Sequence, residues 1–334
     1  MSGRDLLTAI VLGYEIGRRV MEGFGGYVPH NGAGWHSTGT CGVFAAAAGC
    51  ASLLRLPPSQ TAACLGIASS FASGLWGFIH DGAMTKRLHA GRAAEGGLLA
   101  ALLAREGVSG PGRAFEDIWG GFFKTYGGRE PHVNRLTGGL GREWMLRYAA
   151  IKPYASCRDA HAAVDAIGRL IEREKLGEED IVSVGARLNG FLDGMVGGRD
   201  VSTMPAAQMS LPYAVAARIS LGHAGLSAYA EECRRDPRLL SVLGRVRILR
   251  DQTVQASWAS SLVVDTRDGR RFEEPTSTAL GAPEKPLTPE HLRDKFDGLA
   301  RLVLPAEQAD ELADMMLNID ALDDVAHLQR RLAL

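Results

Sequence analysis

Two apolar segments built from small residues constrain the fold of this chain more than any other feature. Residues 41–54 have the sequence CGVFAAAAGCASLL, and residues 59–73 have the sequence SQTAACLGIASSFAS. Alanine is the best helix former, and Pro57 and Pro58 mark a turn before the second segment. Because alanine and glycine have little or no side chain, such helices can bring their axes close together. The pattern predicts closely packed helices.

Helical periodicity continues on either side of these segments. A first helix is expected over residues 2–21, with Ser2 as its cap, Asp5 at the capping-box position and apolar residues at helical spacing. A loop is expected over residues 23–40, and a further helix over residues 88–105. We therefore expect the N-terminal part of the chain to be all-helical.

The pattern changes in the second half of the chain. Segments that alternate in polarity or are rich in β-branched residues predict strands at residues 181–188, 246–249 and 262–266. Helices are expected around them, at residues 158–173, 212–220 and 226–232. Thr288 begins a capped helix, and amphipathic helices follow to the C-terminus. The expected fold class is mainly α, with a large all-helical domain (residues 1–143 and 280–334) and a smaller α/β, or α+β, lid domain (residues 144–279).

The composition excludes several function classes. The formal net charge of −1 gives no positive excess of the kind that nucleic acids and membrane surfaces attract. The five cysteines are widely spread, without a C-x-x-C pair, which argues against a disulfide framework or a structural zinc site. The N-terminus has no signal-peptide pattern, and no transmembrane span is indicated. We expect a cytoplasmic protein with no nucleic-acid or membrane partner.

The segment GWHSTGT, residues 34–40, is the most informative candidate site. His36 stands in a glycine-rich loop directly before an expected helix. The N–H groups at a helix start can hold a carboxylate oxygen, and His36 can exchange a proton with a bound acid. An equally weighted alternative is that Thr38 and its neighbours only cap the helix, with His36 on the surface.

A second candidate segment, DGAMTKRLHAG, covers residues 81–91. Lys86, Arg87 and His89 gather positive charge beside an expected helix start, which suits a di- or tricarboxylate. Taken without the rest of the chain, the segment is more typical of a solvated basic turn.

A third segment, KPYASCRDAH, covers residues 152–161, where the chain leaves an irregular stretch and enters a helix. Its polar side chains are candidates for the same pocket: Lys152, Ser156, Cys157, Arg158 and His161. Covalent catalysis by Cys157 is not favoured, because no partnering His/Asn pattern supports it.

Tyr213, in the segment SLPYAVA, is a candidate acid or carboxylate-binding residue. The commoner alternative is a core tyrosine with a satisfied hydroxyl. Phosphate-binding, dinucleotide-binding, zinc-protease and nucleophile-elbow motifs are absent from the sequence. Acidic residues do not cluster with histidines, so no metal site is expected.

Taken together, these segments resemble the MmgE/PrpD superfamily, which includes 2-methylcitrate dehydratase, cis-aconitate decarboxylase and iminodisuccinate epimerase. The matching stretches are GWHSTGT, QTAACLGIASSFASGL, DGAMTKRLHAGRAA, KPYASCRDAHAAVDA and SLPYAVA, in the family's order over nearly the whole chain. The resemblance implies a large all-helical domain with a smaller α/β lid domain, an active site between them, and usually a homodimer. It also implies an enzyme with no metal and no organic cofactor.

The resemblance assigns roles to individual residues. His36 matches the family's loop histidine, Lys86 the lysine of its T-K-x-L-H segment, Lys152 that of its K-x-[YF]-P segment, and Tyr213 the tyrosine of the lid helix. Cys157 stands where some relatives have a histidine, so proton transfer is not expected there. Family members generally continue further at the N-terminus, with an acidic D-x-D-D-x-H-like segment and an H-P histidine that this chain lacks. We expect either a companion chain that supplies this part, or a truncated or repurposed relative.

The sequence therefore predicts a cofactor-independent lyase, a dehydratase or decarboxylase, that acts on a small di- or tricarboxylic acid. The expected catalytic residues are His36, Lys86, Lys152 and Tyr213. The expected substrate-binding residues are Thr38, Arg87, His89, Ser156, Cys157, Arg158 and His161. The open alternatives are an epimerase of a small dicarboxylate, a non-catalytic partner subunit, and a cofactor-free catalyst of an unusual biosynthetic step.

Overall fold

The computed structural model describes residues 1–127, 131–255 and 258–332, and this described part is mainly helical with one four-stranded sheet. A mainly α fold with a small α/β part is thus confirmed. The chain divides into two compact units. Unit 1 comprises Met1–Phe78, Met84–Tyr148 and Ala300–Leu334, and unit 2 comprises Ile79–Ala83 and Ala149–Leu299. Residues 128–130, 256–257 and 333–334 of the predicted domains lie outside the described residues.

Helices form the described part of unit 1. They are α1 (Gly3–Gly23), α2 (Tyr27–Asn31), α3 (Ser37–Thr40), α4 (Gly42–Leu53), α5 (Pro58–Ala68), α6 (Thr85–Arg105), α7 (Phe122–Gly127), α8 (Val133–Thr137), α16 (Ala306–Leu317) and α17 (Ala326–Leu332). Short 3₁₀ turns connect several of them: η1 (Ser69–Phe71), η2 (Trp76–Ile79), η3 (Met145–Tyr148) and η7 (Ile319–Ala321).

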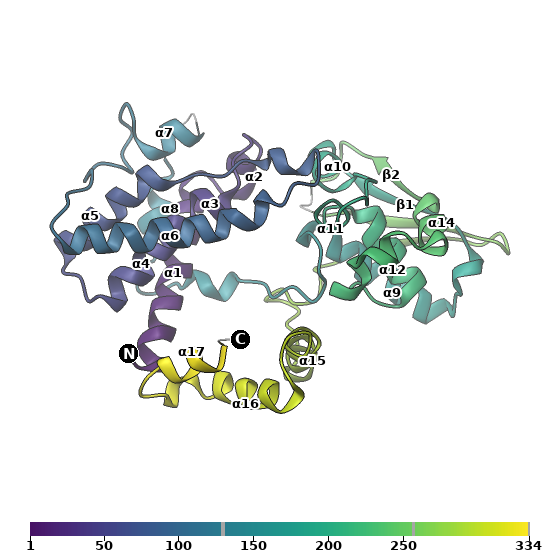
Figure 1. The fold of residues 1–334 in the computed structure, drawn as a ribbon. Coiled ribbons are helices and arrows are strands. Elements are labelled where there is room, and N and C mark those ends of the chain that lie inside the picture. The colour runs from purple at the N-terminus through teal and green to yellow at the C-terminus, as the bar shows by residue number, and fades with distance from the viewer. Residues whose placement is uncertain (128–130, 256–257, 333–334) are drawn as a thin grey trace. The chain divides into compact units, whose positions relative to one another are not determined.

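Helix α4 packs against α1, α5 and α6, and small residues let it do so (Figure 1). A Cβ atom added at Gly17 of α1 would lie 2.7 Å from the Cβ of Ala45 in α4. One added at Gly97 of α6 would lie 2.4 Å from the Cβ of Ala46. Real Cβ atoms do not approach so closely, so a larger residue at either glycine would push the helices apart. The predicted close packing of small-residue helices is confirmed.

The start of α1 has the predicted cap and is tied to the C-terminal part of unit 1. The Ser2 side chain accepts a hydrogen bond from the amide of Asp5, and the Asp5 carboxylate accepts one from the amide of Ser2. The amide of Gly3 donates to the carbonyl of Leu322 at 2.8 Å. These bonds satisfy amide groups that a helix start otherwise leaves without partners.

A buried ion pair on α1 forms further hydrogen bonds to the end of α8 and the segment that follows it. Arg19 and Glu15, one turn apart on α1, are 2% and 3% exposed and contact each other. The Arg19 guanidinium also donates to three carbonyl oxygens, those of Leu136, Gly138 and Glu143. Glu15 also accepts the amide of Met145. This set of contacts, the Arg19 clamp, fixes the course of residues 136–145.

Unit 2 contains the sheet and the helices around it. The helices are α9 (His161–Glu174), α10 (Gly190–Val196), α11 (Met204–Gln208), α12 (Leu211–Leu221), α13 (Glu231–Arg234), α14 (Pro237–Arg245) and α15 (Pro289–Ala300). The 3₁₀ turns are η4 (Arg158–Ala160), η5 (Glu178–Asp180) and η6 (Leu226–Tyr229). The strands are β1 (Ile181–Leu188), β2 (Val246–Arg250), β3 (Ser261–Thr266) and β4 (Arg271–Pro275).

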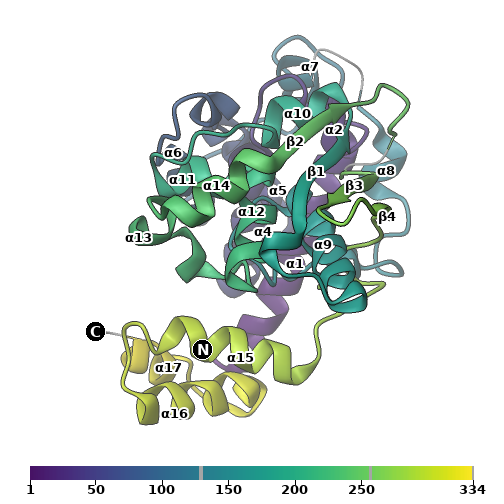
Figure 2. The ribbon, with the colours of Figure 1, turned by 90° about the vertical axis from the view of Figure 1, so that its right-hand side faces the viewer.

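The sheet is mixed, with the strand order β2-β1-β3-β4 among the described residues (Figure 2). β1 pairs with β2 in parallel and with β3 antiparallel, and β3 and β4 are antiparallel. Helices α9, α12 and α14 contact its strands. The three predicted strands are confirmed. The fourth, β4, was missed because its sequence, RFEEP, has three charged residues and no β-branched one.

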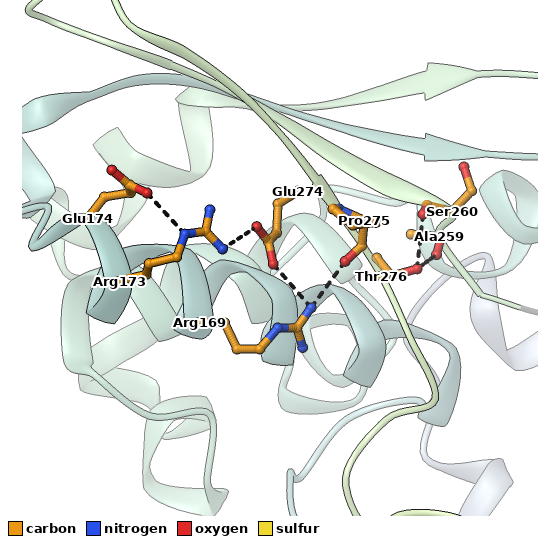
Figure 3. A network of polar contacts seen from close by, with 8 residues as sticks. All are labelled: Arg169, Arg173, Glu174, Ala259, Ser260, Glu274, Pro275 and Thr276. Carbon is orange, nitrogen blue, oxygen red and sulfur yellow. Dashed lines mark hydrogen bonds and ion pairs between the residues drawn. The ribbon is translucent and has the colours of Figure 1, made fainter.

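A buried carboxylate anchors β4 to helix α9 (Figure 3). Glu274 is 5% exposed and accepts hydrogen bonds from Arg169 at 3.3 Å and Arg173 at 2.9 Å, both on α9. Arg169 also donates to the carbonyl of Pro275 at 3.0 Å. A buried carboxylate needs such cations to offset its lost hydration, so this contact holds the edge of the sheet on the helix.

The described residues contain neither a membrane-spanning helix nor a cluster of metal ligands. No helix there is long and apolar enough to cross a membrane. Within the same residues, no group of three or more His, Cys, Asp or Glu side chains is arranged to hold a metal ion.

Candidate functional site

Two loops of unit 1, residues 34–36 and 74–76, are joined by backbone hydrogen bonds. The amide of His36 donates to the carbonyl of Gly74, and the amide of Trp76 donates to the carbonyl of Gly34, both at 3.0 Å. Trp35 and Leu75 form the isolated antiparallel bridge between these bonds. The predicted loop histidine is therefore held by a two-stranded backbone contact.

Asn31 braces this pair of loops from the end of α2. Its side-chain oxygen accepts the indole N–H of Trp76 at 2.8 Å and the amide of Ser37 at 3.3 Å. Its side-chain nitrogen donates to the carbonyl of Tyr27 at 2.9 Å. Because Asn31 occupies the amide of Ser37, that first amide of α3 is engaged within the protein. This contact gives less support to the prediction that amides at the start of this helix bind a substrate carboxylate.

His36 contacts His89 of α6 directly. Their Nδ1 atoms lie 2.8 Å apart, a normal hydrogen-bond length. The His36 side chain is nearly buried, at 6% exposure, and its ring packs edge-on against Trp76 and Phe78. The two histidines, which are 53 residues apart in the sequence, thus form a pair in which His36 is nearly buried and His89 is half-buried.

Lys86 meets the same aromatic rings. Its ammonium lies 5.7 Å from the ring centre of Trp76 and 5.5 Å from that of Phe78, within the range of a cation–π contact. Burial, and then the positive charge of Lys86, lowers the pKa of His89. The structure therefore brings three predicted residues, His36, Lys86 and His89, around two aromatic side chains.

Two glycines make room for this arrangement. A Cβ atom at Gly39 of α3 would lie 2.1 Å from the carbonyl oxygen of Ser73. Gly74 has a φ of +111°, and a Cβ there would lie 3.2 Å from the ring of His89. Side chains at these two positions would displace the loops or the histidine.

The other predicted residues of this region are more peripheral. Thr38 is exposed on the short helix α3, and Arg87 is exposed on the first turn of α6. A cavity of about 450 Å³ lies elsewhere in unit 1, lined by Arg18, Arg19 and Glu22 among others, and it contains none of the predicted site residues.

His30 is a residue of this region that the sequence analysis missed. It is fully buried, stacks on Phe24 with ring centres 4.0 Å apart, and lies 2.6 Å from the hydroxyl of Thr40 through Nε2. Its Nδ1 has no hydrogen-bond partner among the described residues, and burial lowers its pKa to about 4. The signal in the sequence was weak: a second histidine six residues before His36 in the same loop.

In unit 2, the predicted segment 152–161 is folded on itself. Lys152 is exposed and its ammonium donates to the carbonyl of Ser156 at 3.3 Å. Cys157 is buried, and its amide donates to the carbonyl of Gln208 at 2.8 Å. The segment is therefore held by main-chain contacts within unit 2.

Arg158 and His161 continue this segment into α9. The Arg158 guanidinium donates to the carbonyls of Ala279 and Leu280, at 3.0 and 2.8 Å. His161 is fully buried, with Nε2 3.4 Å from the carbonyl of Ser156. Burial, and then the charges of Arg158 and Lys152, lower the pKa of His161 to about 3. A neutral histidine in this environment is suited to holding the segment in place.

Tyr213 lies in the core of unit 2, on α12. It is fully buried, its hydroxyl donates to the carbonyl of Ala228 at 2.7 Å, and its ring packs 5.4 Å from that of Tyr229. Burial raises the pKa of Tyr213. This geometry favours the alternative interpretation, a core tyrosine with a satisfied hydroxyl.

The four predicted catalytic residues divide between the units. His36 and Lys86 meet in unit 1, whereas Lys152 and Tyr213 belong to unit 2. The gathering of all four in one site stays a prediction, as do their individual roles.

Comparison with known proteins identifies the family of the chain. The model of the MmgE/PrpD N-terminal domain matches residues 1–134, and that of the MmgE/PrpD C-terminal domain matches residues 154–321.

The chain is also similar to curated proteins over almost its whole length. It is 28% identical to a cis-aconitate decarboxylase-like protein of Aspergillus oryzae, over 98% of this chain and 71% of that protein. It is 30% identical to a cis-aconitate decarboxylase of Aspergillus terreus, over 98% and 70%. It is 25% identical to the cis-aconitate decarboxylase of Homo sapiens, over 98% and 68%. With both domain models matched, the chain belongs to the MmgE/PrpD family.

Proposed function

We propose that this chain is a lyase acting on a small tricarboxylic acid, with decarboxylation of a cis-aconitate-like substrate as its leading reaction. The observation that carries the proposal is the meeting of His36 and Lys86 on the rings of Trp76 and Phe78 within unit 1. A proton-transfer group and a cation on the same pair of rings can serve the removal of CO₂ from a carboxylic acid. The relatives named cis-aconitate decarboxylases supply the substrate class.

The reaction needs charge stabilisation first. The bond between a carbon atom and one carboxylate breaks, CO₂ leaves, and the electron pair stays on the carbon. That charge spreads into a remaining unsaturated carboxylate, where a nearby cation stabilises it as it develops. We assign this role to the ammonium of Lys86, since it is held against aromatic faces in a partly buried position.

A proton then completes the product. A six-carbon tricarboxylate trianion that takes up one proton and loses one CO₂ becomes a five-carbon dicarboxylate dianion, so atoms and charge balance. We assign delivery of this proton to His36, because its imidazole is nearly buried and contacts the same two aromatic rings as the cation. In the loss of water from a citrate-like acid, the same imidazole would instead remove a carbon-bound proton, and hydroxide would leave with the C–O electron pair and take up a proton to form water.

The test is product analysis with the isolated chain. The protein is incubated with cis-aconitate or with 2-methylcitrate in deuterium oxide, and products are identified by NMR together with the CO₂ released. The proposal predicts CO₂ and a five-carbon diacid carrying one deuterium from cis-aconitate. Exchange of a carbon-bound proton without loss of any fragment would instead indicate an epimerase. No change in either acid would contradict the proposal.

Variants connect the activity to the site. Lys86→Met and His36→Gln should each lower kcat/KM by about 100-fold or more, which is the usual effect of removing an electrostatic or proton-transfer group. Arg92→Met is the matched control, because Arg92 lies on the same helix but is exposed and pairs with Glu95. Circular dichroism checks that each variant is folded. Full activity in both site variants would refute the assignment.

The predicted homodimer and companion chain stay predictions, and light scattering on the same sample measures the oligomeric state.

A further inference from the structure

The two histidines of unit 1 are close enough to restrict each other's protonation. The Nδ1 atoms of His36 and His89 lie 2.8 Å apart and form a hydrogen bond, so one proton lies between them. Two Nδ1–H groups would clash at this distance, and two bare Nδ1 lone pairs would repel. Of the four ring nitrogens, the pair can therefore protonate two in its neutral state and three in its charged state, but not four.

We propose that His36 and His89 work as one proton-transfer unit, in which His89 accepts the Nδ1–H of His36 and thereby leaves the His36 Nε2 to gain and lose the proton. This inference rests on the proposed function for its chemical use. His89 is a positioning residue in it, acting through His36. In water, a free imidazole prefers to carry its proton on Nε2, so the partner at Nδ1 decides which nitrogen of His36 is reactive.

The surroundings favour this direction of the hydrogen bond. The ammonium of Lys86, three residues before His89 on helix α6, opposes a positive charge on His89. We therefore assign the shared proton to His36 and the accepting lone pair to His89. When His36 takes up a second proton, the cation is stabilised by a charge-assisted hydrogen bond to His89.

The neighbouring elements contribute backbone groups, aromatic rings, a further histidine and an arginine. From residues 72–78 come the backbone of Gly74 and the uncharged rings of Trp76 and Phe78. On the side of α2 lies the buried His30, which contacts Thr40, whose hydroxyl in turn donates to the His36 carbonyl at 3.4 Å. On α6, Arg87 is exposed beside Lys86.

The geometry of the site preserves this contact. Gly74 backs the ring of His89, where a Cβ would lie 3.2 Å away, and the amide hydrogen bond to Gly74 holds His36 in place. Both rings are thus fixed from the same loop. A pair positioned in this way does not need to reorganise when the proton moves.

The first test reads the tautomers directly and needs no substrate. Histidine side chains of the full chain are labelled with ¹⁵N, and the ring nitrogens of His36 and His89 are assigned by loss of signals in His36→Gln and His89→Asn. Near pH 8, the proposal expects His36 protonated on Nδ1 and His89 on Nε2. Both rings protonated on Nε2 would overturn it, whatever the enzyme's activity.

Two substitutions at residue 89 then separate positioning from packing. His89→Asn keeps a side-chain oxygen where Nδ1 stood, whereas His89→Leu offers no hydrogen-bond partner. We expect His36 to revert to the Nε2–H tautomer in His89→Leu and to stay Nδ1–H in His89→Asn. The exposed His223, in unit 2, gives the control His223→Leu, which should leave the His36 signals unchanged. An Nδ1–H tautomer of His36 that persists in His89→Leu would refute the role of His89.

Turnover gives an independent reading. Without its acceptor, protonated His36 loses a stabilising contact, so its pKa falls in His89→Leu. The alkaline limb of the kcat/KM profile should then move to lower pH, with about 10-fold lower kcat/KM near pH 8. His89→Asn should keep the limb near its wild-type position. Equal displacement in both variants would contradict the inference, whereas a lack of turnover in the wild type would bear on the proposed function and leave the tautomer test intact.

Discussion

Replacing Arg19 by leucine should destabilise unit 1 far more than replacing its neighbour Arg18. The Arg19→Leu substitution would leave the 3% exposed carboxylate of Glu15 buried without its cation, a change that typically costs about 3–5 kcal/mol. Three main-chain carbonyls would also lose their donor, but Gly138 and Glu143 are exposed residues, so water can replace much of that contact. We expect a total loss of about 4 kcal/mol or more. Arg18→Leu removes only a surface ion pair with Glu22, which is worth about 1 kcal/mol or less.

Urea unfolding followed by tryptophan fluorescence measures the difference. Trp35, Trp76, Trp119 and Trp144 belong to unit 1, whereas Trp258 belongs to unit 2. A Trp258→Phe background therefore makes the signal specific for unit 1, which matters because two units need not unfold as one.

A double variant tests whether the unpaired Glu15 carboxylate causes this loss of stability. Glu15→Leu combined with Arg19→Leu removes the orphaned carboxylate, so it should be less destabilising than Arg19→Leu by itself. If Arg19→Leu shifts the urea midpoint no more than Arg18→Leu, the ion pair and its carbonyl contacts do not hold residues 136–145 as described.

Three further outcomes are expected. Burial lowers the pKa of His30 to about 4 from its ordinary 6.5. The contribution of neutral His30 to stability is therefore complete above pH 6.5 and is lost as the pH falls towards 4. The His30→Gln variant should lose less urea stability between pH 7 and 4.5 than the wild type. Gly39→Ala, whose new Cβ would lie 2.1 Å from a carbonyl oxygen, should lower stability and turnover together, whereas Gly77→Ala, with open space around its Cβ, should change stability by less than about 1 kcal/mol. Glu274→Gln should destabilise unit 2 by about 1–3 kcal/mol, and the same change at the exposed Glu273 by clearly less; equal effects would argue against the buried ion pairs.

Local sequence signals predicted most of the regular elements, because those elements depend on neighbouring residues. The expected strand at 181–188 is β1 itself, and the cap at Ser2 and Asp5 forms as expected. The helix expected at 88–105 begins three residues earlier, at Thr85, since the basic turn before it is helical. Helix α14, Pro237–Arg245, was missed, although Asp236 caps its start, Pro237 occupies its first turn and its apolar residues repeat at helical spacing.

Local sequence signals did not predict how the residues of the site contact one another. The sequence placed His36 and His89 in two candidate segments, but the 2.8 Å contact between their rings depends on a loop pairing between residues 34–36 and 74–76. That pairing rests on Asn31, a residue with no catalytic signature. Tyr213 illustrates the opposite case, because only the fold showed that its hydroxyl is taken by the carbonyl of Ala228.

Chemical rescue of His36→Ala tests the account's central claim, that His36 moves the proton in the reaction. Removing this nearly buried ring leaves space against Trp76 for a small proton donor such as imidazolium. The account predicts that His36→Ala has lost turnover of cis-aconitate and that added imidazole restores part of it in a saturable manner. His36→Ala with wild-type turnover and no response to imidazole would contradict it.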